Sequence, residues 1–189
     1  MRTKILCIIL LIFFLISCNS LGLDNESSEP TSSMFSSDSK ASEKSRHYEK
    51  EGGFSYVIPE GWELTDIHDL KYQGLIDSKS KNILISNIAI SVEEHSGKLD
   101  AYVDASIKNL EIKFPDKTII RKDKLVNDQG LTYYSVNMIS NVHNTEIPQV
   151  TFIFSMGDTK LLLIYSTSKD EDIQNLLKVG DFINSIRIE

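Results

Sequence analysis

The chain has 189 residues, of which 20 are Lys or Arg and 27 are Asp or Glu, so its formal net charge is −7. This length suits one ordinary domain with additional segments. Nucleic-acid binding needs a concentrated basic patch, so the acidic balance argues against nucleic acid as a partner.

The start of the chain has the pattern of a bacterial lipoprotein signal. Arg2 and Lys4 precede an apolar run over residues 5–16, which Ser17 and Cys18 follow. A basic start, a short apolar segment and a small residue before the cut site are typical of secretion signals. The run is 12 residues long, whereas a bilayer-spanning helix needs roughly 20. We predict a lipoprotein signal peptide at 1–17 with lipid on Cys18; an uncleaved membrane helix and a plain secretory signal are the alternatives.

Lipid on Cys18 would place the protein in the bacterial cell envelope. A diacylglyceryl group on its sulfur, with an acyl chain such as palmitate on its amine, would attach it durably to a membrane. Cys7 leaves with the signal, so the mature chain keeps one cysteine and no disulfide forms within it. Asn19 stands where an aspartate commonly retains Gram-negative lipoproteins in the inner membrane. We therefore expect a protein anchored in the outer membrane, facing the periplasm or the surface.

Residues 18–50 are rich in serine and poor in apolar side chains. A segment of this composition cannot bury enough surface to offset the entropy of ordering it. We predict a disordered tether that begins at the lipidated cysteine and has an average reach of about 30 Å. A recognition tail is the alternative. A single folded domain would then occupy residues 51–189.

The first half of the domain has the pattern of short strands and one helix. The expected strands, separated in part by the turn Pro59-Glu60-Gly61, are 54–58, 62–64, a ragged edge strand within 69–80, and 83–92 with a bulge at Ser86-Asn87. A helix should follow because apolar residues recur three or four apart, at Leu99, Val103, Ile107, Leu110 and Phe114. Pro115 should end it.

The second half indicates consecutive hairpins and a second helix. The expected strands are 118–125, 131–139, 150–156 and 160–167, with turns at residues 127–130 and at Gly157-Asp158. A capping box at residues 168–171 should start a helix that runs to about Asn184, unless Gly180 ends it early. Ile186 and Ile188 favour a brief final strand. Consecutive hairpins with two helices predict an α+β domain built on an antiparallel sheet.

Three segments resemble the PsbP/Mog1-like fold. Residues 54–62, Phe-Ser-Tyr-Val-Ile-Pro-Glu-Gly-Trp, are similar to its opening; Leu99-Asp100-Ala101-Tyr102-Val103 is similar to the start of its first helix; and residues 182–188 are similar to its closing strand. The resemblance implies a curved antiparallel sheet flanked by helices over residues 52–189. It also implies partner binding rather than catalysis, and it supplies no catalytic residue.

Few residues point to chemistry. The four histidines, none at metal-ligand spacing from another, are His47, His68, His95 and His143. Two local clusters could supply ligands to a metal ion: Asp66, His68 and Asp69, and Glu93, Glu94 and His95. We interpret both as solvated residues at strand ends. We accordingly predict no catalytic residue, no metal ligand and no cofactor.

Aromatic side chains are the candidates for contact with a partner or ligand. Trp62 could line a pocket, with core packing as the alternative. Tyr133 and Tyr134 are adjacent in a predicted strand, so they should point to opposite faces, and we expect one of the two rings to be exposed. Tyr102 lies off the main apolar stripe of its helix.

Three functional hypotheses follow. The first is a membrane-anchored, non-catalytic lipoprotein that acts as a binding or accessory module for envelope or host proteins. The second is an envelope protein that binds a small molecule or metal ion in a pocket between sheet and helix. The third is a hydrolase whose site is assembled from separate loops.

Overall fold

The computed structural model describes residues 46–67, 69–79, 86–115, 117–142, 145–167 and 173–189. The predicted signal, Cys18 and most of the tether lie outside these ranges. His68, His143 and the expected capping box at 168–171 lie outside them too.

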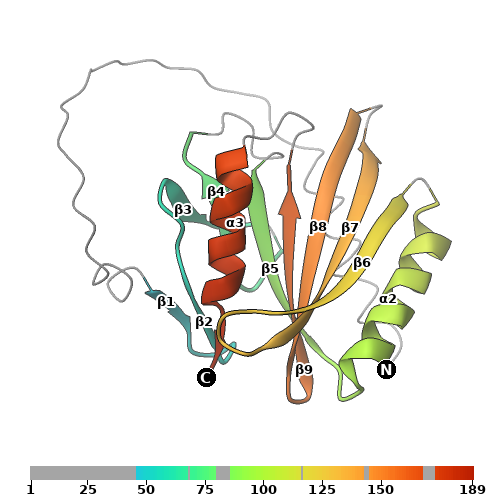
Figure 1. The fold of residues 1–189 in the computed structure, drawn as a ribbon, viewed down its shortest axis with the longest axis horizontal. Helices are drawn as coiled ribbons and strands as arrows, with labels where there is room; N and C mark the ends of the chain where they lie inside the picture. Colours follow the sequence, from blue (N-terminus) through green and yellow to red (C-terminus); the bar gives the residue numbers. More distant parts are fainter. Residues whose placement is uncertain (1–45, 68, 80–85, 116, 143–144, 168–172) are drawn as a thin grey trace. The chain divides into compact units, whose positions relative to one another are not determined.

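A seven-stranded antiparallel sheet, drawn from nearly the whole domain, is the main element (Figure 1). Its strands, in spatial order, are β3 (Trp62–Thr65), β4 (Gly74–Asp77), β5 (Asn87–Glu94), β9 (Thr159–Ser166), β8 (Thr145–Met156), β7 (Thr132–Val142) and β6 (Thr118–Val126). A smaller three-stranded sheet has the order β1 (Arg46–Glu49), β2 (Phe54–Val57) and β10 (Arg187–Ile188). The α+β fold expected from the hairpin pattern is confirmed.

Helix α3 (Ile173–Ser185) and the small sheet pack on one face of the large sheet, where the larger core lies. Figure 1 shows α3 in front of this face. The face is apolar because alternate residues of β5, β8 and β9 point toward α3. Fully buried members of this core include Phe54, Tyr56, Leu75, Ile90, Phe154, Leu163, Phe182 and Ile186.

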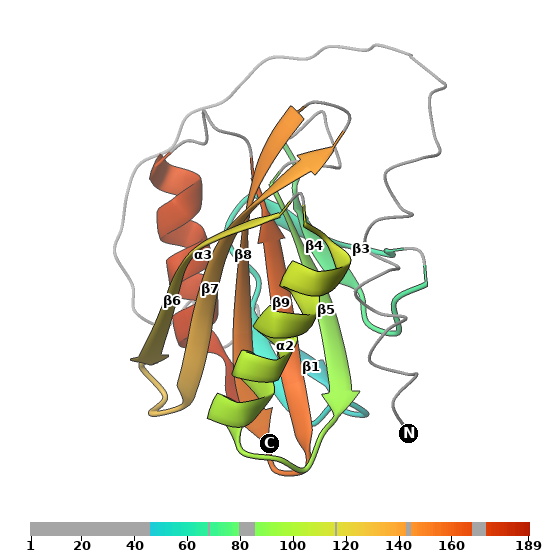
Figure 2. The same cartoon turned by 90° about the vertical axis from the view of Figure 1, so that its right-hand side faces the viewer.

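Helix α2 (Leu99–Lys113) covers the opposite face, as Figure 2 shows. Its contact is smaller, because only Tyr102 and Val103 are buried along the helix. They pack on a second cluster of sheet residues, Tyr134, Val136, Met138, Ile153 and Leu162. The predicted apolar stripe is confirmed in part, since Leu99, Ile107 and Leu110 pack against this cluster with partial burial.

The turns follow the glycine signals in the sequence. Met156 pairs with Thr159, so Gly157 and Asp158 form the two-residue hairpin that was predicted between β8 and β9. Gly157 has a φ of 58°, a left-handed conformation that glycine adopts without strain. Figure 1 shows this turn at the bottom of the sheet, where β9 begins.

Three strands differ from the sequence prediction. Strand β1, at Arg46–Glu49, falls within residues 18–50, because pairing with β2 orders a segment whose composition alone favours a tether. Only Gly74–Asp77 forms a strand within residues 69–80. Strand β8 begins at Thr145 rather than at 150, across Pro148. Proline is tolerated there because β9 pairs with β8 only as far as Gln149.

Helix α3 continues through Gly180 to Ser185, so the early end considered for it is wrong. Glycine in a helix interior costs about 1 kcal/mol relative to alanine. Burial of Val179, Phe182 and Ile183 on either side of it outweighs that cost. Neither helix in the described ranges is long and apolar enough to cross a membrane.

Candidate functional site

A cluster of buried polar residues lies where β5 ends and β9 begins, beside the first turns of α2. Glu93 on β5 pairs directly with Lys160 on β9, so both side chains lie on the α2 side of the sheet. They are only 5% and 0% exposed. Tyr102 reaches the same place from α2, and His95 from the loop between β5 and α2.

Glu93 is held by a single strong hydrogen bond. The hydroxyl of Tyr102 donates to its Oε2 at 2.6 Å, while its Oε1 is buried with no hydrogen-bond partner. Burial raises the pKa of the Glu93 carboxyl, and the Tyr102 hydrogen bond and the nearby His95 only partly oppose that effect. The His95 ring packs edge-on against Tyr102, with ring centroids 4.8 Å apart. Glu93 is therefore a buried acid whose charged form is disfavoured.

Lys160 is bound by backbone oxygens. Its ammonium group donates to the carbonyls of His95 at 2.7 Å, Thr159 at 3.1 Å and Gly157 at 3.4 Å. The amide of His95 also donates to the carbonyl of Asp158, at 2.8 Å. These bonds join the loop that precedes α2 to the turn between β8 and β9. Burial lowers the pKa of Lys160, and the carboxylate of Asp158 opposes this effect.

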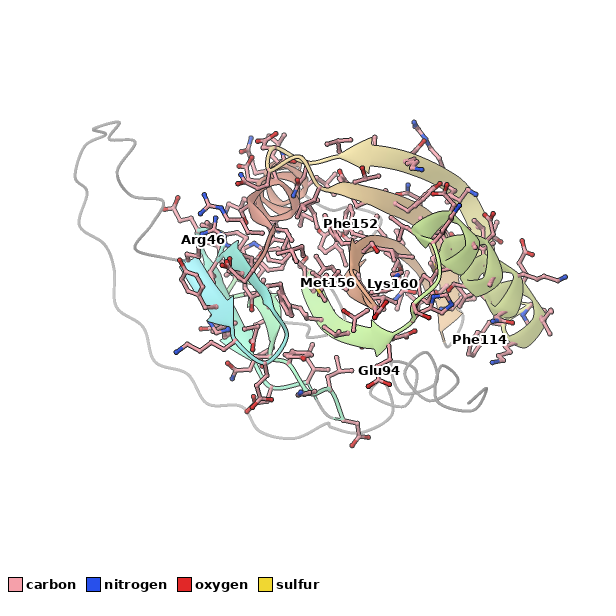
Figure 3. All side chains as sticks on the ribbon, turned by 90° about the horizontal axis from the view of Figure 1, so that it is seen from below. Arg46, Glu94, Phe114, Phe152, Met156 and Lys160 are labelled. Carbon is pink, nitrogen blue, oxygen red and sulfur yellow. The ribbon has the colours of Figure 1, made fainter. Side chains whose placement is uncertain are left out.

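The cluster thus holds α2 in place on the sheet. Glu93 and Lys160 are both inaccessible, and their hydrogen bonds connect β5, β9 and α2 to one another. Glu94 points to the other face of β5 and into solvent, whereas Lys160 lies beside the turn (Figure 3). The two carboxylates of the sequence cluster Glu93-Glu94-His95 are therefore on opposite faces. Among the described residues, no group of three His, Cys, Asp or Glu side chains could hold a metal ion.

Solved structures of other proteins share this architecture. The solution structure of cyanobacterial PsbP (CyanoP) from Synechocystis sp. PCC 6803 superimposes with a TM-score of 0.57 at 14% identity, covering 82% of this chain and 98% of that one. The domain has a PsbP-like fold. The crystal structure of LpqN, involved in cell envelope biogenesis of Mycobacterium tuberculosis, also gives a TM-score of 0.57, at 10% identity, covering 70% of this chain and 81% of that one.

A crystal structure from Bacteroides thetaiotaomicron is similar at a TM-score of 0.50 and 11% identity, covering 77% of this chain and 48% of that one. No protein-family model matches the sequence, and a search of curated proteins finds no significant relative. At these levels of identity the comparisons establish the PsbP-like fold, which the sequence motifs at residues 54–62, 99–103 and 182–188 predicted.

The aromatic residues predicted as contacts are buried in the PsbP-like domain. Trp62 is 6% exposed, and Tyr133 and Tyr134 are each 8% exposed. The two tyrosines do point to opposite faces, since Tyr133 pairs with Phe154 and Tyr134 with Ile153. The expectation that one ring is exposed is wrong, because each face has its own cover.

The covers differ between the two faces. Tyr133 stacks on Phe154 with centroids 4.9 Å apart, on the α3 side. On the α2 side, Tyr134 donates to Asp100 at 2.9 Å and lies beneath the ammonium groups of Lys122 and Lys124, each 5.6 Å from its centroid. A contact role for these residues stays a prediction.

The other sequence cluster has two described members, Asp66 and Asp69. Asp66 accepts a hydrogen bond from the side-chain amide of Gln73 at 3.0 Å, and His68 lies outside the described residues. His47 bonds to Glu49 at 2.8 Å within β1, far along the chain from the buried cluster at His95.

Sequence reasoning missed the contact between Glu93 and Tyr102 and the role of Lys160. One signal was available: Lys160 is the second residue of a strand whose next residues, from Leu161 to Leu163, are all buried. A lysine in such a strand must bring its ammonium group to an acceptor. The identity of that acceptor depends on the loop around His95, which no local pattern specifies.

Proposed function

We propose that this protein is a membrane-anchored, non-catalytic accessory module of the bacterial cell envelope, which binds another envelope or host protein. The support comes from three levels. The N-terminal pattern around Cys18 favours a lipid anchor, the serine-rich segment favours a tether, and the PsbP-like fold is shared with LpqN, which is involved in cell envelope biogenesis. The anchor would hold the domain at the outer membrane.

The outer patch of α3, which consists of Leu176, Leu177 and Gly180, is the observation on which the binding role rests. The leucines are 47% and 58% exposed, although the same helix buries Val179 and Phe182 completely on its inner side. A Cβ atom at Gly180 would meet nothing within 4 Å, so the surface beside the leucines is open. Neighbouring exposed leucines give α3 a small apolar patch, the kind of surface that a partner could cover.

The occupant of the outer patch would be a protein with an apolar surface of its own. Helix α3 is anchored at both ends, since Asn175 donates to Asp77 on β4 at 3.0 Å and the carbonyls of Ile183 and Ile186 accept from Asn127. A rigid helix loses little entropy when it binds, which favours a helix-in-groove or helix-on-surface contact.

Affinity capture from envelope extracts tests the binding role. Wild-type protein should enrich one envelope protein, and Leu177→Glu should reduce that enrichment at least tenfold because a charge would be buried in the contact. Gln174→Glu places the same charge on α3 at an exposed position next to the patch and should have a smaller effect. Equal recovery with wild type and Leu177→Glu would count against the outer patch.

A small-molecule role is the second candidate, supported by two buried donors. The hydroxyl of Tyr56 and the indole nitrogen of Trp62 have no hydrogen-bond partner in the core between the sheet and α3. A ligand with acceptor atoms would satisfy them. Trp62 is the single tryptophan, so its fluorescence should shift when a protein-free extract of envelope small molecules is added, and an unchanged spectrum would remove this candidate.

A further inference from the structure

Strand β6 forms one edge of the seven-stranded sheet and, within the described residues, has a strand partner on one side only. Its burial pattern is exposed at most positions. Three of its large apolar side chains face solvent: Ile120 at 61%, Leu125 at 42% and Val126 at 65% exposure. Figure 2 shows α2 in front of the sheet and β6 at its left-hand edge. Such an edge is a template for pairing with another strand.

The features that usually protect an edge do not protect most of β6. Bulges and lysines serve this purpose in natural sheets. The bulge here lies between Ile119 and Arg121, so the stretch that follows pairs regularly with β7. Lys122 and Lys124 are bound to α2, with their ammonium groups 2.7 Å from Asp104 and 2.8 Å from Asp100. Their charges are therefore compensated on the α2 face.

We propose that β6 pairs with β6 of a second copy of this chain, antiparallel, around a two-fold axis at Lys122. In this register Arg121 of each copy lies opposite Asp123 of the other, which gives two symmetric pairs of opposite charge. Within one chain these two side chains already attract each other, with 2.6 Å between Nε and Oδ2. Pairing across the axis would join them into a four-charge ladder.

The exposed apolar residues lie at the two ends of this register. Ile120 of each copy lies opposite Lys124 of the other, while Leu125 and Val126 lie opposite Ile119 and Thr118. Ile120 and Val126 are then diagonal neighbours across the pair, and such neighbours stabilise a sheet. The bulge between Ile119 and Arg121 falls at each end of the contact, so its regular part is centred on residues 121–123.

Other arrangements of two β6 strands are less favourable. An axis at Asp123 places Asp123 opposite itself and Lys122 opposite Lys124. Parallel pairing in register places every charge beside its like. An axis between two residues would set side chains of opposite faces against each other, because side chains alternate along a strand. At the proposed axis the one pair of like charges is Lys122 with itself, and Asp104 compensates each of those charges.

Cysteine crosslinking in intact cells tests the register. In full-length Lys122→Cys protein the two new cysteines would be directly opposite each other. Their Cα atoms would be about 4.5–5.5 Å apart, a distance that suits a disulfide. The matched control is Lys124→Cys, an exposed lysine that is also paired with an aspartate of α2. Its two copies would be offset by four residues, about 14 Å. Wild-type protein controls for crosslinks through Cys18.

Mild oxidation should convert Lys122→Cys protein to a covalent dimer and leave Lys124→Cys protein monomeric. Adding Arg121→Asp should lower the dimer yield about tenfold, since both attractive pairs become repulsive. The double exchange Arg121→Asp with Asp123→Arg should restore it. Absence of the Lys122→Cys dimer, equal yields at positions 122 and 124, or no response to Arg121→Asp would each overturn the proposal.

Discussion

At the residue scale, Asn127 shows how one side chain connects distant parts of the fold. Its amide group donates to the carbonyls of Ile183 and Ile186, at 3.2 and 3.1 Å. Its oxygen accepts from the amides of Gln129 and Leu131, at 3.1 and 2.9 Å. The turn between β6 and β7 is thereby joined to the end of α3, and Asn127 is only 4% exposed.

Replacing Asn127 should be costly. Asn127→Ala removes four hydrogen bonds from a buried site, so we expect a loss of about 2–4 kcal/mol in the free energy of unfolding. Urea denaturation measures it. Gln129→Ala, on the same turn but exposed, should change stability by less than about 0.5 kcal/mol. Similar midpoints for the two variants would contradict this role.

Glu93 predicts a specific pH dependence. Burial raises the pKa of the Glu93 carboxyl in the folded protein above its value in the unfolded chain. The protonated carboxyl therefore contributes its full share to the free energy of unfolding below the unfolded pKa. This share is lost as the pH rises through the folded pKa. Glu93→Gln keeps an acceptor for Tyr102 and removes the buried charge.

The free energy of unfolding of Glu93→Gln, relative to wild type, should therefore increase from pH 4 to pH 8. Urea denaturation at several pH values gives this difference, and Glu94→Gln on the exposed face is the control. A difference that stays flat or falls with pH would show that burial does not disfavour the charged form of Glu93.

At the element scale, the sequence was most informative where local chemistry and tertiary contacts agree. The alternation in 150–156, the Gly157-Asp158 turn and the apolar spacing of 99–114 each specify their element without help from the rest of the chain. Strand β1 was missed because four residues, Arg-His-Tyr-Glu, become a strand only through their ladder with β2. The site was missed for the same reason, since Glu93 and Tyr102 meet only after α2 packs on the sheet.

Helix α3 carries a glycine that its conformation does not need. Gly180 is helical, exposed, and has open space where a Cβ would lie. Gly180→Ala should therefore stabilise the domain by about 0.5–1 kcal/mol. Thermal unfolding measures it. Gly157→Ala is the opposite case, because a φ of 58° strains any other residue, and it should lower the midpoint. A destabilised Gly180→Ala variant would contradict the open surface at this position.

At the scale of the whole molecule, the proposed function combines a lipid anchor, a tether and a PsbP-like domain. The acidic chain has 27 acidic against 20 basic residues, so attachment to anionic membranes would depend on lipid rather than on charge. The domain would be held near the membrane yet free to reach a partner. Being confined to the same membrane as its partner would raise the effective concentration of the domain around that partner.

The anchor gives the simplest prediction at this scale. Cys18→Ser should abolish metabolic labelling with a clickable palmitate and move the protein from the membrane to the soluble fraction. The loss follows because no other cysteine remains in the predicted mature chain to carry lipid. Labelling that persists in Cys18→Ser would show that the acyl group is attached elsewhere.

The proposed binding of an envelope or host protein through the outer patch of α3 can be tested by photo-crosslinking in intact cells. The crosslinker is placed at position 177, and position 109 on the exposed side of α2 is the reference. One defined adduct should form from position 177 that position 109 does not give. An absence of adducts at 177, or the same adducts from both positions, would contradict binding through this patch.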